Sequence, residues 1–182
     1  MKTNNEIKEP NNLDQLLVKL KKEDSNYANI SKAITIVYWI FIPLFIILTI
    51  IEYVELHNIQ VFISGSGFVI AFLIFALFFR KYYKEYKYVD YSLPTLLMLK
   101  KAAWRYKPFQ LRSFWILLAI LFMDVALTFN WGIRSSISVF HTQIVIGSAL
   151  MIGIVVGLIL WFIKYKPIRD EALQLIKEIE GE

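Results

Sequence analysis

The residue best placed to do chemistry is a single carboxylate in an otherwise apolar stretch. Asp124 lies within the segment 113–131, and it is the only charged residue well inside any of the chain's four apolar stretches. A carboxylate inside a membrane-spanning helix costs at least ~2.5 kcal/mol on insertion scales and is by default a functional candidate. Asp124 could therefore serve as a proton or cation site in a small transporter or channel.

Asp124 also has a purely structural interpretation. It could be protonated and hydrogen-bonded to Ser64, Ser66 or Ser148 on a neighbouring helix, or Arg134 could reach it from the adjoining loop. A proton relay usually needs more than one ionisable group within the membrane, and no second one lies at comparable depth. The sequence leaves both interpretations open.

A row of small residues marks one face of the last apolar stretch. Ala149, Gly153 and Gly157 recur every four residues, and the last two form a GxxxG match in "GIVVG". Small residues at this spacing let two membrane helices approach closely. The row predicts helix packing, either inside a four-helix bundle or between two copies of the chain.

Signatures of enzymes and metal sites are missing from the sequence. There is no cysteine, and the two histidines, His57 and His141, show no ligand spacing. No Gly-rich phosphate loop, HExxH motif or GxSxG motif occurs. We therefore expect a protein that is not an enzyme and that has no metal site and no cofactor.

Four segments are long and apolar enough to cross a membrane, which takes about 20 residues for a hydrocarbon core of about 30 Å. They cover 33 to about 52, 61–79, 113–131 and 143–163. The first contains Pro43, which should cause at most a kink. The sequence thus predicts an all-α polytopic membrane protein with four transmembrane helices in two hairpins.

Lysine and arginine fall almost entirely on one side of these spans. Of the 20 basic residues, 19 lie in the N-terminal segment, the middle loop or the C-terminal tail. The positive-inside rule places these parts in the cytoplasm. The expected division is an N-terminal tail 1–32, hairpin 33–79, basic loop 80–112, hairpin 113–163 and C-terminal helix 164–182.

Each of the three polar parts contains an amphipathic helical pattern. The patterns cover 12–24, the stretch 92–107 with Ser92 as N-cap, and 168–179 in the C-terminal tail. The middle one could lie in the headgroup layer of an anionic membrane. Alternatively, the three helices could pack together as a cytoplasmic platform for a protein partner.

The basic loop supplies the residues expected to contact a partner or lipid headgroups. They are Arg80, Lys81, Lys84, Lys87, Lys100, Lys101, Arg105 and Lys107. The interleaved tyrosines Tyr82, Tyr83, Tyr86 and Tyr88 fit an interfacial aromatic belt. Because these residues lie so close to the bilayer, nucleic-acid binding is not expected.

The N-terminal segment and the basic loop contain similar stretches. "LDQLLVKLKK" can be set against "LPTLLMLKK", and each leads into a hairpin of spans. A diverged tandem duplication would produce this likeness, and so would chance, since Leu and Lys are common residues. Both explanations stay open.

The stretches "VDYSLPTLLMLKKAAWRYKPFQLR" and "YKPIRDEALQLIKEIE" carry one further hint. They resemble small four-span inner-membrane proteins of Bacteroidota-type bacteria, over the middle loop and tail more than over the spans. The resemblance implies a bacterial inner membrane, and it carries no activity, substrate or functional residue.

Taken together, these patterns favour a non-enzymatic inner-membrane protein with both termini in the cytoplasm. It would act as an anchor, regulator or subunit of a membrane complex through its cytoplasmic helices, with a protein partner or a second copy of itself. The alternative is a small transporter or channel that uses Asp124.

Overall fold

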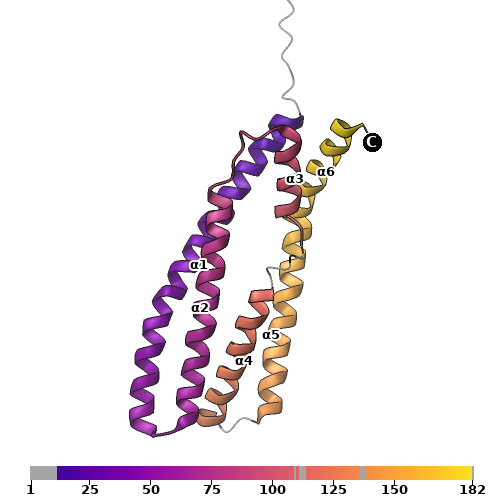
Figure 1. Ribbon diagram of the computed structural model, residues 1–182. Coiled ribbons are helices and arrows are strands. Elements are labelled where there is room, and N and C mark those ends of the chain that lie inside the picture. Colours follow the sequence, from indigo (N-terminus) through magenta and orange to yellow (C-terminus); the bar gives the residue numbers. More distant parts are fainter. Residues whose placement is uncertain (1–11, 109, 111–113, 136–137, 182) are drawn as a thin grey trace, which may run out of the picture.

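The computed structural model describes residues 12–108, 110, 114–135 and 138–181, and these residues form helices and no strand (Figure 1). The order is α1 (Asn12–Leu56), α2 (Ile59–Lys87), α3 (Thr95–Arg105), α4 (Phe114–Ser135), α5 (Val139–Leu160), a π-helical turn (Trp161–Tyr165) and α6 (Lys166–Glu180). The predicted all-α fold is confirmed.

Four helices are long and apolar enough to span a membrane, so the chain is a multi-pass membrane protein. They are α1, α2, α4 and the continuous helical run formed by α5, the π-turn and α6. At 1.5 Å per residue, α1 is about 68 Å long, more than twice a hydrocarbon core of about 30 Å. The amphipathic segment near its start is therefore a direct extension of the first span, and Pro43 does not end the helix.

The side chain of Thr49 in α1 packs directly onto the backbone of Gly65 in α2. A Cβ atom built on Gly65 would lie 2.6 Å from the Cβ of Thr49, so only glycine fits at this point. Aromatic rings fill the rest of the contact. Tyr38 stacks on Phe75 with ring centroids 5.1 Å apart, and Phe45 meets Phe72 edge-on at 5.0 Å.

The second hairpin joins the first through α4. Ser64 of α2 donates a hydrogen bond to the Ala126 carbonyl of α4 at 2.9 Å, and Gly67 leaves room for Ala126 beside it. By contrast, nearly all of α5 is exposed along its length. The helix packs weakly within one copy of the chain, and lipid or another protein must cover its apolar surface.

The π-turn joins α5 to α6 without breaking the helical run. Pro167 has no backbone N–H to donate to the carbonyl four residues earlier, and a wider turn at this point is one way to relieve such a mismatch. The Lys166 N–H bonds instead to the Trp161 carbonyl. Beyond the turn, Ile168, Ala172 and Ile176 form the buried face of α6.

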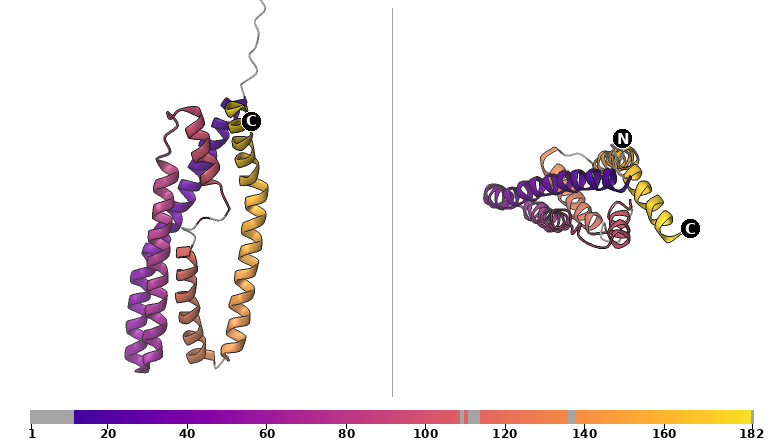
Figure 2. Two further views of the ribbon diagram at one scale, coloured as in Figure 1. Left: turned by 45° about the vertical axis from the view of Figure 1, so that its right-hand side comes forward. Right: turned by 90° about the horizontal axis from the view of Figure 1, so that it is seen from above.

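At one end of the molecule, four helical parts pack into what we call the extramembrane layer. It consists of the first part of α1 (13–28), the last part of α2 (78–86), α3 with Tyr106, and α6. Figures 1 and 2 show that α3 runs beside α6 in nearly the direction of the spans, at the same end as both described chain ends. The three amphipathic patterns therefore share one core, so the packing that the platform arrangement requires is present.

Two details differ from the sequence expectations. Ser92 does not cap α3, because its N–H and hydroxyl both bond to Asp90 and the cap position is Pro94. The two similar stretches are also arranged differently, since the first continues directly into its span whereas α3 ends before α4 begins.

Candidate functional site

The extramembrane layer is organised around a carboxylate in the middle of its core. The buried side of α1 reads Leu16, Leu20, Asp24 and Ala28, each four residues apart and none more than 4 % exposed. That spacing places all four on one helix face. Asp24 thus occupies a core position, where an ionised carboxylate needs partners.

Three side chains from the basic loop satisfy Asp24. The Arg105 guanidinium donates from Nη2 to Oδ2 at 2.9 Å, the Tyr91 hydroxyl donates to the same oxygen at 2.5 Å, and the Tyr106 hydroxyl donates to Oδ1 at 2.6 Å. These residues lie more than sixty positions from Asp24 in the chain. The cluster therefore fastens the basic loop to the start of α1.

The same cluster alters the acidity of its two tyrosines. Burial, together with the neighbouring Asp24 carboxylate, raises the pKa of the Tyr91 and Tyr106 hydroxyls well above the ordinary value of 10.0. An ionised phenol here would lie buried against a carboxylate. Both tyrosines therefore stay neutral and donate hydrogen bonds to Asp24.

Arg105 corrects one prediction. The sequence placed it among the cations available to a partner or to lipid headgroups, but it is only 8 % exposed and paired with Asp24. The other seven predicted contact residues are exposed: Arg80, Lys81, Lys84, Lys87, Lys100, Lys101 and Lys107. Lys100 is joined to Glu180 of α6 by an ion pair of 2.5 Å.

The tyrosines expected in an interfacial belt divide between core and surface. Tyr82 and Tyr86 are buried in the layer, whereas Tyr88 is 71 % exposed and Tyr83 is half-buried. Tyr27 of α1 stacks on Tyr86 with ring centroids 4.4 Å apart. Two of the four tyrosines are therefore packing residues rather than a belt.

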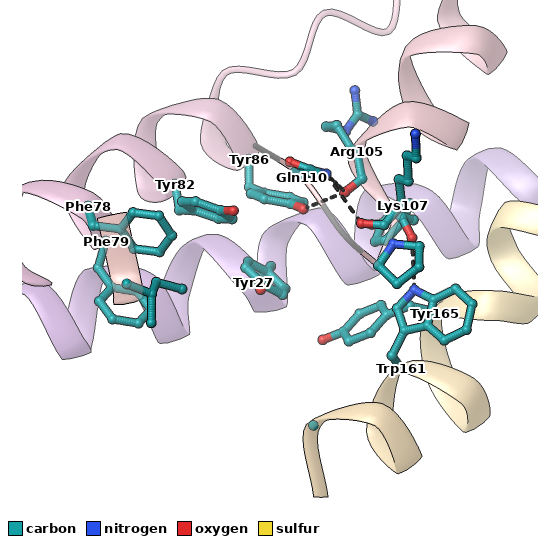
Figure 3. A pocket seen from close by; sticks show the side chains of 14 residues that line it. Tyr27, Phe78, Phe79, Tyr82, Tyr86, Arg105, Lys107, Gln110, Trp161 and Tyr165 are labelled. Atoms are coloured by element: carbon teal, nitrogen blue, oxygen red, sulfur yellow. Dashed lines mark hydrogen bonds between the residues drawn. The ribbon is translucent and has the colours of Figure 1, made fainter. Parts of the chain in front are cut away.

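An aromatic cavity of about 310 Å³ lies where the layer meets the spans (Figure 3). Tyr27, Tyr86, Trp161 and Tyr165 lie around it, whereas the charged ends of Arg105 and Lys107 point away. The Tyr86 hydroxyl donates to the Arg105 carbonyl at 3.3 Å, and the Trp161 Nε1–H donates to the Tyr106 carbonyl at 2.9 Å. The cavity therefore offers a largely aromatic surface, in which the Tyr86 hydroxyl and the Trp161 indole N–H are already hydrogen-bonded.

Asp124 is hydrogen-bonded to a residue that the sequence analysis did not single out. The Gln143 amide of α5 donates from Nε2 to Asp124 Oδ1 at 2.9 Å and lies 3.0 Å from the Thr128 hydroxyl. Two of the expected partners are engaged elsewhere, since Ser64 bonds to the Ala126 carbonyl and Ser148 bonds to the Ile144 carbonyl. The third, Ser66, lines a surface pocket formed by residues of α1 and α2. The Arg134 side chain lies outside the described residues.

The row of small residues does not pack against another helix of the described chain. Ala149, Gly153 and Gly157 are all exposed, and a Cβ built on either glycine meets nothing within 4 Å. Packing inside a four-helix bundle is therefore wrong for this row. Among the described glycines, those that pack closely against another helix are Gly65 and Gly67 of α2.

Histidine, aspartate and glutamate do not gather into a group suited to a metal ion anywhere in the described part of the chain. Comparison with protein-family models, with curated proteins and with solved structures finds no match to this chain.

Proposed function

We propose that this protein is a non-enzymatic inner-membrane protein of a bacterium, with both termini in the cytoplasm, whose extramembrane layer binds a protein partner. It would serve as an anchor, a regulator or a subunit of a larger membrane complex. The observation that carries this proposal is the layer itself: four helical parts fold into one core and leave one face of α3 outside it.

The outer face of α3 has the composition of a protein interface. Leu97, Lys101 and Trp104 follow one another at i, i+4 and i+7 and are exposed, Leu97 by 44 % and Trp104 by 56 %. Aromatic residues are enriched at the centres of protein–protein contacts, and cations beside them add specificity. A helix held only by lipid headgroups would lie flat on the membrane, but α3 runs nearly along the spans (Figure 1).

The test is gentle extraction from native membranes, followed by mass spectrometry of proteins that co-purify at fixed stoichiometry. A Lys101→Glu, Trp104→Ala variant should lose the partner. Lys22→Glu alters an exposed lysine elsewhere in the layer and should keep it. Arg105→Glu is unsuitable, because it would disrupt the buried cluster as well. If the double variant still co-purified with the same partner at the same stoichiometry, the proposal would be contradicted.

A second candidate function rests on the polar group inside the second hairpin. The Gln143 amide lies within hydrogen-bonding distance of both Asp124 and Thr128. Polar groups inside spans often mark a path for ions or protons. A small transporter or channel would use Asp124 as its proton or cation site.

This second candidate makes a separate prediction. Asp124→Asn keeps an oxygen that can accept from Gln143 but removes the carboxylate, so the fold should survive while flux in proteoliposomes is lost. Thr128→Val is a matched control within the same polar group. Flux that is insensitive to Asp124→Asn, or no flux with the unaltered protein, would remove this candidate.

A further inference from the structure

A surface pocket of about 260 Å³ is lined by residues of α1, of α2 and by Tyr91. Its charged lining consists of Lys21, Asp24 and Lys32 of α1 and Lys87 of α2. Asp24 is already neutralised by Arg105 at 2.9 Å. The three lysines therefore leave the pocket with a positive balance.

Neutral hydrogen-bonding groups lie between the lysines. Ser25 and Asn29 are exposed on the same face of α1, since 21, 25, 29 and 32 follow the spacing of a single helix side. Across the pocket, Lys87 Nζ lies 2.7 Å from the Tyr83 hydroxyl and 5.2 Å from the centre of its ring. These contacts hold the Lys87 side chain at the pocket instead of leaving it free in solvent.

The pocket also lies at a particular depth. Lys32 directly precedes the apolar stretch of α1, which begins at Ala33, and Lys87 ends α2 eight residues after its apolar stretch. Lys32 therefore lies where the first apolar stretch would leave the hydrocarbon core, next to the headgroups, and at 1.5 Å per residue Lys87 lies about 12 Å beyond the end of the second stretch. Basic pockets between helices at this level are suited to phosphate-bearing headgroups.

We propose that Lys21, Lys32 and Lys87, with Ser25 and Asn29, form a binding site for a phosphate group. The lysines supply charge, and the hydroxyl and amide groups donate hydrogen bonds to phosphate oxygens. The phosphate could belong to an anionic lipid headgroup or to a soluble phosphate compound, and both offer the same chemistry. The site is independent of partner binding by α3, because the two surfaces share no residue.

The experiment compares the full chain with two triple variants that have the same net charge. Lys21→Gln, Lys32→Gln, Lys87→Gln removes the pocket cations. Lys22→Gln, Lys81→Gln, Lys84→Gln removes three exposed lysines that do not line the pocket. Each protein is reconstituted with phosphatidylcholine and phosphatidylglycerol, and native mass spectrometry measures the phosphatidylglycerol that is retained. Inorganic phosphate is tested in parallel as a competitor.

One nearby cation contributes about a fivefold factor to binding at an anionic surface. We therefore expect the pocket variant to retain phosphatidylglycerol at least about tenfold less than the unaltered chain and the control variant. Displacement by inorganic phosphate, without a preference for phosphatidylglycerol, would assign the site to a soluble phosphate compound. Equal retention by both variants, or no binding of either probe, would overturn the proposal.

Discussion

At the residue scale, the buried Asp24 of α1 matters most for the stability of the layer. Asp24 is 1 % exposed, and its carboxylate accepts from Arg105, Tyr91 and Tyr106, all in or beside α3. Removing one partner of a buried ion pair leaves the other charge uncompensated, which typically costs about 3–5 kcal/mol. The attachment of α3 to the layer should therefore depend on this one side chain.

Asp24→Asn should loosen the layer without disturbing the spans. A loss of about 3 kcal/mol corresponds to roughly hundredfold faster hydrogen–deuterium exchange in α3. Asp14→Asn, at an exposed position on the same helix, should change little. A double Asp24→Leu, Arg105→Met variant should lose less than the two single changes summed. Unchanged exchange in Asp24→Asn would refute the structural role of the cluster.

The two tyrosines of the cluster give a pH prediction. Because their pKa values are raised above 10.0 in the folded protein, the stability that they contribute is fully present below pH 10. It is lost as the pH rises towards the folded pKa values, since an unfolded tyrosine releases its proton first. An ultraviolet titration should show a tyrosinate component that appears late, and a Tyr91→Phe, Tyr106→Phe variant should show less of it. Part of the component should remain, because burial also raises the pKa of Tyr165. A late component of unchanged size in that variant would contradict the prediction.

At the element scale, the contact between α1 and α2 depends on a glycine. A methyl group on Gly65 would overlap the Thr49 side chain, because the Cβ atoms would be 2.6 Å apart. Gly65→Ala should therefore push the two helices apart and lower the thermal stability of the purified protein. Overpacking of this kind typically costs about 1–3 kcal/mol.

The matched control is Gly147→Ala in α5, where an added Cβ meets nothing within 4 Å. That change should be neutral or slightly stabilising, because alanine favours a helix more than glycine does. Replacing Thr49 by alanine together with Gly65→Ala should restore part of the loss. Equal effects of Gly65→Ala and Gly147→Ala would contradict the close packing.

The helices themselves were largely predictable from the sequence, since the length of an apolar stretch and the spacing of apolar residues are local properties. The face that each helix turns towards its neighbours was less predictable. The α5 sequence is apolar on all sides, and no face is marked for packing; for this reason the Gln143 contact of Asp124 and the exposure of Gly153 and Gly157 were missed.

The burial of Asp24 could have been predicted from the spacing of its neighbours in the sequence. Extending the row Leu16, Leu20 by four residues reaches Asp24 and then Ala28, which places a carboxylate in a buried row. The identity of its partners could not be read in the same way. Arg105 lies 81 positions away, and its pairing depends on how α3 docks.

At the scale of the whole molecule, the chain combines loosely packed membrane-spanning helices with a well-packed layer at one end. The core of buried residues lies mainly in the layer, whereas α5 is exposed along nearly all of its length. Lipid contact alone can cover an apolar helix, and so can another protein in the membrane. The fold therefore presents two surfaces suited to assembly, the outer face of α3 and the exposed sides of α5.

The central claim is that the layer lies on the cytoplasmic side, and cysteine labelling in intact cells tests it most directly. The chain has no cysteine, so single cysteines can be introduced one at a time. Two positions, Lys22 and Lys101, lie in the layer, and two, Glu55 and Ser138, lie at the opposite end. All four side chains are exposed, and Ser138 is the N-cap of α5. A membrane-impermeant reagent should label the Glu55 and Ser138 positions in intact cells, and the Lys22 and Lys101 positions only after lysis. Labelling of the layer positions in intact cells, with Glu55 and Ser138 protected, would contradict the account.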